Sequence, residues 1–187
     1  MKEKFEFPKL EKPQSEKEAK LQKIHEDVER ITDNLGKPVE QEIKETVVMF
    51  KAFDLPTSDS CEGHSLEERK KEGAERRSSA PYVEVYPKEP EEENWQENDE
   101  LRAQVEKESK EYRLKTVSLL NEFYKERRMS YDTMLGLEGI GYGFRVQSNG
   151  LEILEVLPEK EQIEKQRQYK QEMQDFTKFL KDKFLSE

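Results

Sequence analysis

The residue types that most often do chemistry gather in one stretch, Thr57–His64, which reads Thr-Ser-Asp-Ser-Cys-Glu-Gly-His. It holds the single cysteine of the chain and one of its two histidines. A Cys-x-x-His spacing suits a thiolate assisted by histidine, part of a metal site, or a polar turn that binds a ligand. The competing interpretation is structural: Cys61 packs as a small apolar residue and His64 satisfies a backbone carbonyl. The spacing alone leaves these interpretations open.

For nucleophilic catalysis, His64 would lower the pKa of Cys61 or accept its proton, with Glu62 or Asp59 orienting the imidazole. We therefore predict Cys61, His64 and Glu62 as catalytic residues. The thiol and the imidazole should approach each other across Gly63, where the missing Cβ lets the chain reverse. In that case the thiol reacts readily with an alkylating reagent, and His64→Ala slows the reaction.

For metal binding, Cys61 and His64 supply two ligands, and the others would come from Asp59, Glu62, His25 or distant carboxylates. Two ligands fall short of a closed structural zinc site. The sequence by itself therefore assigns no metal ligands and leaves the cofactor unknown.

For ligand binding, the polar residues beside the cysteine and on the following strand are the candidates. We predict Asp59, Ser60, Tyr82 and Glu84 as ligand-binding residues. The charged loop 69–77 would approach the same site. The expected partner is a small molecule or another protein.

Composition limits the class of protein. The 187 residues are 32% hydrophobic and 41% charged, with a formal net charge of -10, so the core must be thin and the helices well solvated. Such a charge repels nucleic acid and anionic membrane, and nucleic acid is not an expected partner. No apolar run of about 18 residues and no leader at Met1 are present, which predicts a soluble cytoplasmic protein without membrane contact. The oligomeric state stays unknown.

The pattern of elements predicts an α+β fold: a small, largely antiparallel sheet with a hairpin in the C-terminal half, covered by about four amphipathic helices. Residues 1–13 should be a tail, and residues 14–187 a single domain in which 88–100 is an acidic linker. The four helices are expected from a capping box at Ser15 to Gly36, from Pro38 to before Pro56, from about Asp99 to Arg128 with a projecting first half, and after Pro158.

Two strand regions are expected. Residues 81–87 should form a short strand at a sheet edge, because prolines bracket it. Residues 144–148 and 151–156 should pair through an Asn149-Gly150 turn, with the glycine-rich run 136–143 as a flexible lead-in. This hairpin should join the same sheet as residues 82–86.

The alternative function is a non-enzymatic protein–protein interaction module that uses the long charged helices from Asp99 and Glu159. Burial separates the two functions. A sealed Cys61 and His64 with no pocket would favour the module, whereas an open polar pocket would favour a ligand or catalytic site.

Residues 31–87 resemble an uncharacterised bacterial family in which a helix leads into a Ser-Cys-Glu-Gly-His loop and an aromatic strand. The resemblance rests on Gly36-Lys37-Pro38, Ile43-Lys44-Glu45-Thr46-Val47, Thr57, Ser60–His64 and Ala80-Pro81-Tyr82-Val83. It implies no activity. The Ser60-Cys61 turn is also similar to the Ser-Cys-Ser-Gly-Arg segment of the wybutosine-synthesising tRNA methyltransferase family, with Glu62 in place of the second serine and His64 in place of the arginine. This second resemblance implies the location of a site.

Overall fold

The computed structural model describes residues 15–32, 36–69, 78–154 and 156–186. The predicted tail and most of the predicted approaching loop, 70–77, lie outside these residues. The helices are α1 Glu16–Glu29, α2 Gln41–Ala52, α3 Leu66–Arg69, η1 Trp95–Glu97, α4 Asp99–Phe123, α5 Leu151–Leu154 and α6 Glu159–Ser186. The strands are β1 Thr57–Cys61, β2 Tyr82–Val85, β3 Leu135–Ile140 and β4 Gly143–Ser148.

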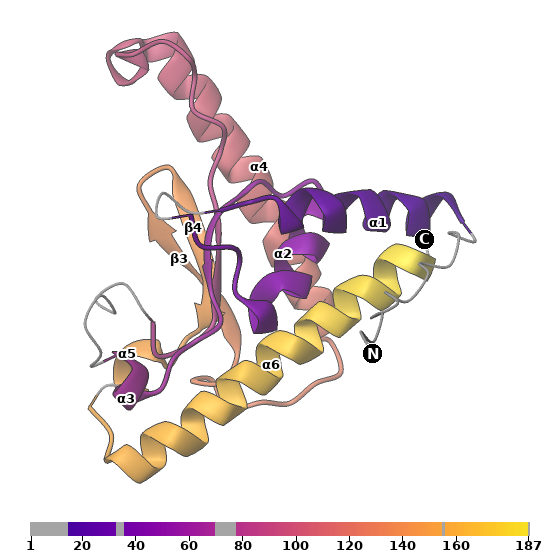
Figure 1. Cartoon of the computed structure of the whole chain (residues 1–187). Helices are drawn as coiled ribbons and strands as arrows, with labels where there is room; N and C mark the ends of the chain where they lie inside the picture. The colour runs from indigo at the N-terminus through magenta and orange to yellow at the C-terminus, as the bar shows by residue number, and fades with distance from the viewer. Residues whose placement is uncertain (1–14, 33–35, 70–77, 155, 187) are drawn as a thin grey trace, which may run out of the picture.

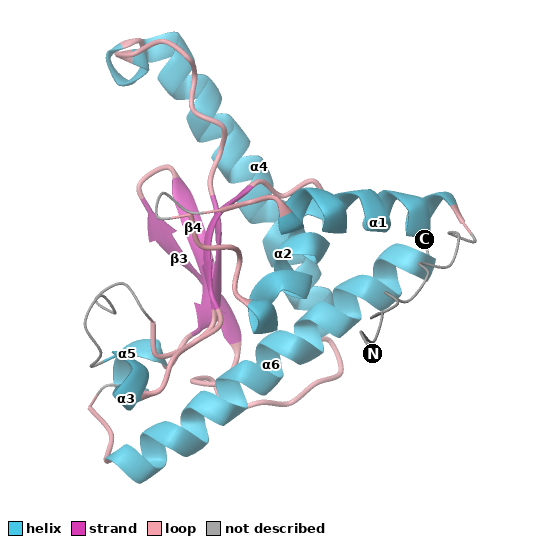
Figure 2. Ribbon diagram, in the orientation of Figure 1, coloured by secondary structure: helices cyan, strands magenta, loops and turns pink. Residues whose placement is uncertain are grey.

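The four strands form one antiparallel sheet in the order β1-β2-β4-β3, and the larger helices lie against one side of it (Figure 1; Figure 2). The predicted α+β class with a small antiparallel sheet is therefore confirmed. The prediction that residues 81–87 form an edge strand is wrong, because β2 pairs with both β1 and β4. Pro81 and Pro87 lie just outside the paired residues, so they leave the hydrogen bonds of the ladder intact.

The hairpin of the C-terminal half lies one strand earlier than predicted. It joins β3 to β4, with Ile140 paired to Gly143 and Gly141 at φ +50° in the turn. The glycine-rich run is thus a strand and its turn, not a lead-in. β4 pairs with β2, as predicted for residues 144–148.

The predicted Asn149-Gly150 turn is not a hairpin, since residues 151–154 are the short helix α5. The Asn149 N–H donates to the Met134 carbonyl and the Gly150 N–H to the Asp132 carbonyl, which ties this dipeptide to the segment before β3. Leu154 is buried in a small cluster with Tyr169 of α6. The Asn-Gly signal is local, and this long-range packing overrides it.

The core lies between one face of the sheet and helices α2, α4 and α6. Val83, Val85 and Val146 point to that face and are fully buried, as alternation along a strand requires. Phe50 of α2 and Phe176 of α6 meet edge to face at 6.3 Å. The opposite face of the sheet carries the polar residues of the strands, and the candidate site is built there and at the end of β1.

The boundaries of α1 and α2 matter for the site. The capping box at Ser15 is present, but α1 ends at Glu29 rather than at Gly36. Pro38 does not open α2; it forms an isolated bridge with Thr32, and the helix begins at Gln41. Glu40 therefore occupies the N-cap position in extended backbone.

Helix α4 begins at Asp99, as predicted, with Asn98 as its N-cap, and it ends at Phe123 rather than at Arg128. Its first half projects from the body beside the chain that precedes it (Figure 1). Within the predicted acidic linker, Trp95 is buried and its ring lies 5.0 Å from that of Tyr142. Across the described part of the chain, no helix has the length and apolarity needed to cross a membrane.

Candidate functional site

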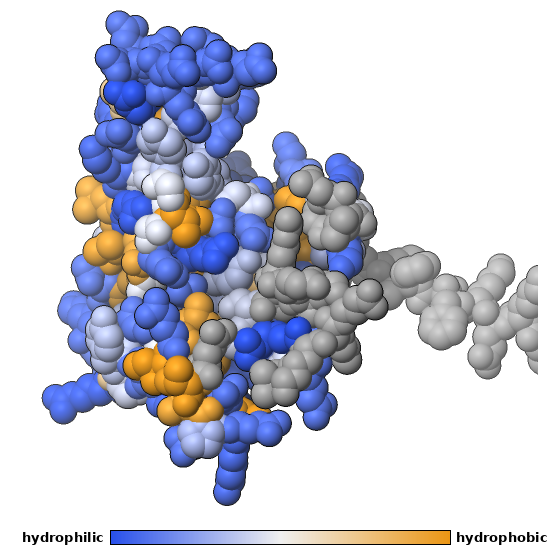
Figure 3. Space-filling view, turned by 90° about the vertical axis from the view of Figure 1, so that its left-hand side faces the viewer, coloured by the Kyte–Doolittle hydropathy of each residue, from blue (hydrophilic) through white to orange (hydrophobic). Residues whose placement is uncertain are grey.

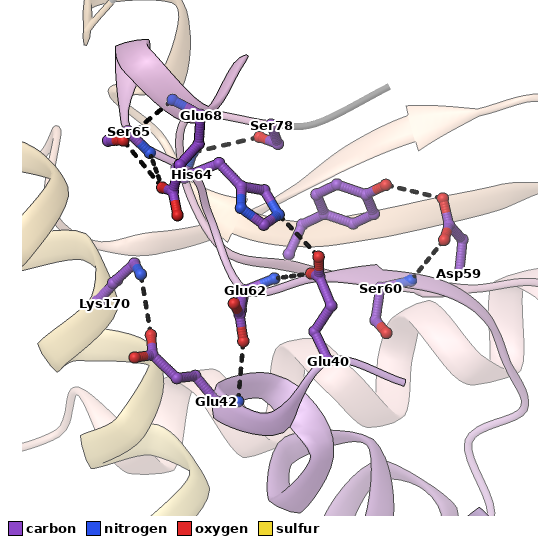
Figure 4. A network of polar contacts seen from close by, with 12 residues as sticks. Glu40, Glu42, Asp59, Ser60, Glu62, His64, Ser65, Glu68, Ser78 and Lys170 are labelled. Carbon is purple, nitrogen blue, oxygen red and sulfur yellow. Dashed lines mark hydrogen bonds and ion pairs between the residues drawn. The ribbon is translucent and has the colours of Figure 1, made fainter. Parts of the chain in front are cut away.

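Three side chains with metal-binding or catalytic donor atoms meet at the end of β1. The carboxylate of Glu40, the thiol of Cys61 and the imidazole of His64 lie within 4.8 Å of one another. His64 Nε2 and Glu40 Oε1 are 2.8 Å apart and hydrogen-bonded (Figure 4). We call these three residues the Glu–Cys–His cluster. They come from the N-cap of α2, the last residue of β1 and the loop that follows it.

Gly63 brings Cys61 and His64 together. Its φ of +78° lies in the left-handed region, and a Cβ there would lie 2.9 Å from backbone atoms of Ala80 and Pro81. Only glycine tolerates both conditions. The His64 N–H then donates to the Ser78 carbonyl at 2.7 Å, so the loop is held against the segment that leads into β2.

Glu40 is the residue that sequence reasoning missed. Its second carboxylate oxygen accepts the Glu62 N–H at 2.8 Å, so one side chain joins the loop at two points. The available signal was a glutamate at an N-cap position, where shorter polar side chains are preferred. Glu40 indeed makes no capping hydrogen bond, which frees its carboxylate for the loop.

Glu62 does not orient His64. Its carboxylate accepts a hydrogen bond from the Glu42 N–H at 3.0 Å in the first turn of α2, where the helix dipole stabilises a negative charge. The carboxylate of Glu42 in turn pairs with Lys170 of α6 at 2.9 Å. The predicted role of imidazole partner thus falls to Glu40, and Glu62 fastens the loop to α2.

Burial raises the pKa of the Cys61 thiol to about 11. This value includes a smaller rise from the Glu40 carboxylate and the opposing effect of the backbone at Gly63 and Ser78, which lowers the pKa. The residue is 4% exposed. Cys61 is therefore a protonated thiol near neutral pH, and a thiolate there would need a cation beside it.

Two of the predicted ligand-binding residues, Asp59 and Tyr82, contact each other through their side chains. The Tyr82 hydroxyl donates to Asp59 at 2.7 Å, and Asp59 also accepts the Ser60 N–H at 2.8 Å. Burial, and then the Asp59 carboxylate, raise the pKa of Tyr82. Glu84 accepts hydrogen bonds from Ser58 at 2.8 Å and from Arg145 at 3.1 Å.

A pocket of about 330 Å³ opens beside the cluster, between the loop, α3, α5 and α6. His64 and Ser65 line it from the loop, Arg69 from α3, and Ile163 and Gln166 from α6. Among the described residues, His64 is the single member of the cluster in this wall, and the four predicted ligand-binding residues lie outside it.

Ile163 of α6 is 61% exposed and lines the pocket. Ser79 was also missed. It is 2% exposed, lines the pocket, and its hydroxyl has no hydrogen-bond partner among the described residues. No sequence signal marks such a serine, because its isolation depends on how α6 crosses the loop.

Comparisons of the chain with protein-family models, curated proteins and solved structures gave no match. The resemblances of residues 31–87 and of the Ser60-Cys61 turn stay predictions. The candidate site is therefore defined by its own geometry: the Glu–Cys–His cluster and the adjacent pocket that shares His64 with it.

Proposed function

We propose that this protein binds a small organic molecule in the pocket beside the Ser-Cys-Glu-Gly-His loop. The volume of about 330 Å³ falls in the range of pockets that hold small ligands. The wall combines apolar side chains, such as Leu154, with side chains that hydrogen-bond. A mixture of this kind both buries a ligand and orients it.

The Ser79 hydroxyl carries the proposal. A buried polar group without a partner costs about 1–3 kcal/mol, so proteins rarely keep one unless something else satisfies it. The backbone carbonyl of Ser79 accepts a hydrogen bond from Gln166 at 2.9 Å, which holds the residue in the pocket wall. A bound molecule with a polar group at this point would complete the hydrogen bonding of Ser79.

The charged and apolar side chains of the wall limit the class of ligand that the pocket can bind. The wall contains Arg69 together with Glu67 and Glu159, so it presents both signs of charge. This favours a zwitterionic or neutral molecule over a strongly anionic one. Figure 3 shows apolar side chains gathered at the lower end of the face that it draws. In the pocket wall, Ile163 is 61% exposed. The ligand should therefore also carry an apolar portion.

His64 is the residue of the pocket wall that could transfer a proton to or from a bound molecule. It lies in the pocket wall and its Nε2 is hydrogen-bonded to Glu40, an arrangement in which a carboxylate orients a histidine for proton transfer. A bound molecule that reacts would exchange its proton with His64. Cys61 does not line the pocket, so this proposal gives it no contact with the ligand.

A thermal-stability screen tests the proposal. Small zwitterionic, neutral, carboxylate and phosphate compounds are added to the protein. A compound that binds the folded state stabilises it, by about 2.7 kcal/mol when its concentration is 100 times Kd, and therefore raises the melting temperature. Ser79→Ala should reduce the shift, and Ile163→Trp should abolish it by filling the pocket.

Ser148→Ala is the matched control. Ser148 is another buried serine whose hydroxyl has no partner among the described residues, but it does not line the pocket. The shift should survive in this variant. Equal shifts in the parent, Ser79→Ala and Ile163→Trp proteins would place the bound compound elsewhere and refute the proposal.

One observation favours the alternative, a protein–protein interaction module. Leu114 and Val117 lie one turn apart on α4 and are 71% and 40% exposed. Adjacent exposed apolar side chains on a long helix are typical of a surface that binds another protein. A defined partner whose binding weakens in Leu114→Glu but not in Ile163→Trp would support this function over the first.

A further inference from the structure

The Glu–Cys–His cluster offers a kind of chemistry that small-molecule binding does not use. Its three donor atoms are a carboxylate oxygen, a sulfur and an imidazole nitrogen, all within 4.8 Å of one another. We propose that Glu40, Cys61 and His64 bind a divalent transition-metal ion, with Zn²⁺ as the expected metal. This site is separate from the proposed ligand contacts at Ser79 and shares His64 with the pocket.

The donor set selects the class of metal. Thiolate and imidazole favour zinc and its neighbours in the transition series, whereas Mg²⁺ and Ca²⁺ require oxygen ligands. Charge also fits. The Glu40 carboxylate and a Cys61 thiolate together balance a dication, so the occupied site is neutral, which a largely buried position requires.

The geometry needs little adjustment. Zinc bonds of about 2.0–2.3 Å separate tetrahedral donors by roughly 3.3–3.8 Å, so donors within 4.8 Å need to move by about 1 Å. The 2.8 Å hydrogen bond between His64 and Glu40 would open as both groups bind the metal, so metal binding and proton transfer through this pair exclude each other. The Glu40 side chain is 33% exposed, which gives the ion a route from solvent.

The surrounding hydrogen bonds already orient two of the ligands. The Glu62 N–H holds one oxygen of Glu40 at 2.8 Å and leaves the other directed at His64. These contacts act on the ligands before any metal arrives.

The site has three protein ligands and one open position. The other candidate metal ligands have different partners. Asp59 accepts a hydrogen bond from Tyr82, Glu62 accepts one from the Glu42 N–H, and His25 pairs with Glu45. Within the described residues, the cluster holds no fourth donor. Three ligands with an open position are typical of zinc sites that bind water or a substrate, not of closed structural sites.

The test is a titration of metal-free full-length protein with Co²⁺, followed by displacement with Zn²⁺. We expect one Co²⁺ per chain, visible absorption of a tetrahedral centre, and a near-ultraviolet sulfur-to-cobalt band. Cys61→Ser should remove the near-ultraviolet band. Glu40→Gln and His64→Asn should each weaken binding by about tenfold or more.

His25→Ala is the matched control, since it removes the other histidine that is bonded to a glutamate. It should leave the titration unchanged, as should Ser79→Ala, so that failure of the metal site and failure of the ligand pocket remain distinguishable. Equal affinity in the Cys61→Ser and parent proteins, or loss of binding in His25→Ala alone, would overturn the proposal. So would the absence of binding at millimolar Co²⁺.

If a variant fails to fold, the proposal can still be tested on the parent protein. X-ray absorption on zinc-loaded parent protein reports the ligands directly. One sulfur and at least two nitrogen or oxygen neighbours at about 2.0–2.3 Å would support the site, and a zinc shell without sulfur would overturn it.

Discussion

The two histidines of this protein each bond a glutamate, but in different surroundings. His25 and Glu45 are 3.0 Å apart, with side chains 39% and 36% exposed, and they join α1 to α2. His64 and Glu40 are 2.8 Å apart, with side chains 7% and 33% exposed, and Cys61 lies beside them. The pairs have the same chemistry, so the difference between them must come from burial and from the third donor.

An exposed pair of this kind contributes little, because water solvates both groups nearly as well when they are apart. The second pair is different, since loss of Glu40 leaves the 7% exposed His64 side chain without this hydrogen bond in a place that little water reaches. A histidine–glutamate pair therefore indicates a candidate site only when its burial and its neighbours are known. The following predictions test this comparison, from the largest expected effect to the smallest.

The largest effect should come from the turn that places His64. Gly63→Ala adds a Cβ at φ +78° and within 2.9 Å of the backbone of Ala80 and Pro81, and it should cost roughly 2–4 kcal/mol of unfolding free energy. Gly36→Ala has a similar φ of +74°, but among the described residues no atom lies within 4 Å of the added Cβ. It should cost about 1 kcal/mol. Urea unfolding measures both, and equal losses would show that the turn at Gly63 is not constrained by packing.

The second prediction concerns the buried thiol. Its pKa is about 11 in the folded protein and 9.0 ordinarily, so folding favours the protonated form. The resulting stabilisation, on the order of 3 kcal/mol at most, is complete below pH 9 and is lost as the pH rises from 9 to 11. The difference in unfolding free energy between the parent and Cys61→Ala should shrink over this interval.

The same thiol should react slowly with iodoacetamide at pH 7, and its rate should rise with pH toward 11. Glu40→Gln should speed the reaction at fixed pH, because the Glu40 carboxylate raises the pKa of Cys61. Fast alkylation of the parent at pH 7 that slows in His64→Ala would instead restore the sequence-based view of a thiol activated by histidine.

The third prediction compares the glutamates directly. Glu40→Ala removes the partner of the buried His64 and the acceptor of the Glu62 N–H, and it should cost about 1–3 kcal/mol. Glu45→Ala acts on the exposed pair with His25 and should cost about 0.5 kcal/mol or less. Thermal unfolding of the two variants measures the contrast, and similar losses would remove the distinction between the pairs.

The smallest effects should come from the lysines of α6. Lys170 pairs with Glu42 and Lys181 with Glu45, each at 2.9 Å, and all four side chains are 30% exposed or more. Lys170→Ala and Lys181→Ala should each change stability by about 0.5 kcal/mol or less. A loss above about 1 kcal/mol in Lys170→Ala alone would extend the buried network of the site to α6.

Local signals predicted a large part of the fold. The capping box at Ser15, the start of a helix at Asp99, the end of a helix before Pro56 and the strand from Tyr82 depend on neighbouring residues, and each is present in the structure. The apolar pattern likewise predicted an antiparallel sheet covered by helices. The location of the site loop was also readable, because a cysteine, a histidine and a positive-φ glycine lie within four residues.

The remaining features depend on contacts between segments far apart in the chain. The hairpin lies at residues 135–148 and not at 144–156. Asn149 and Gly150 form no two-residue turn, because their N–H groups hydrogen-bond to the segment before β3. The strand from Tyr82 is central because β1 and β4 flank it, and bracketing prolines do not reveal whether a second neighbour exists.

The sequence by itself determined that Cys61 and His64 would lie close together, since only Glu62 and Gly63 stand between them. Tertiary structure alone decided that Glu40, 24 residues from His64, completes the cluster, and that α6 closes the pocket around Ser79. The physical reason is that local backbone geometry fixes neighbours within a few residues. Which distant side chain reaches them is set by how α2 and α6 pack on the sheet.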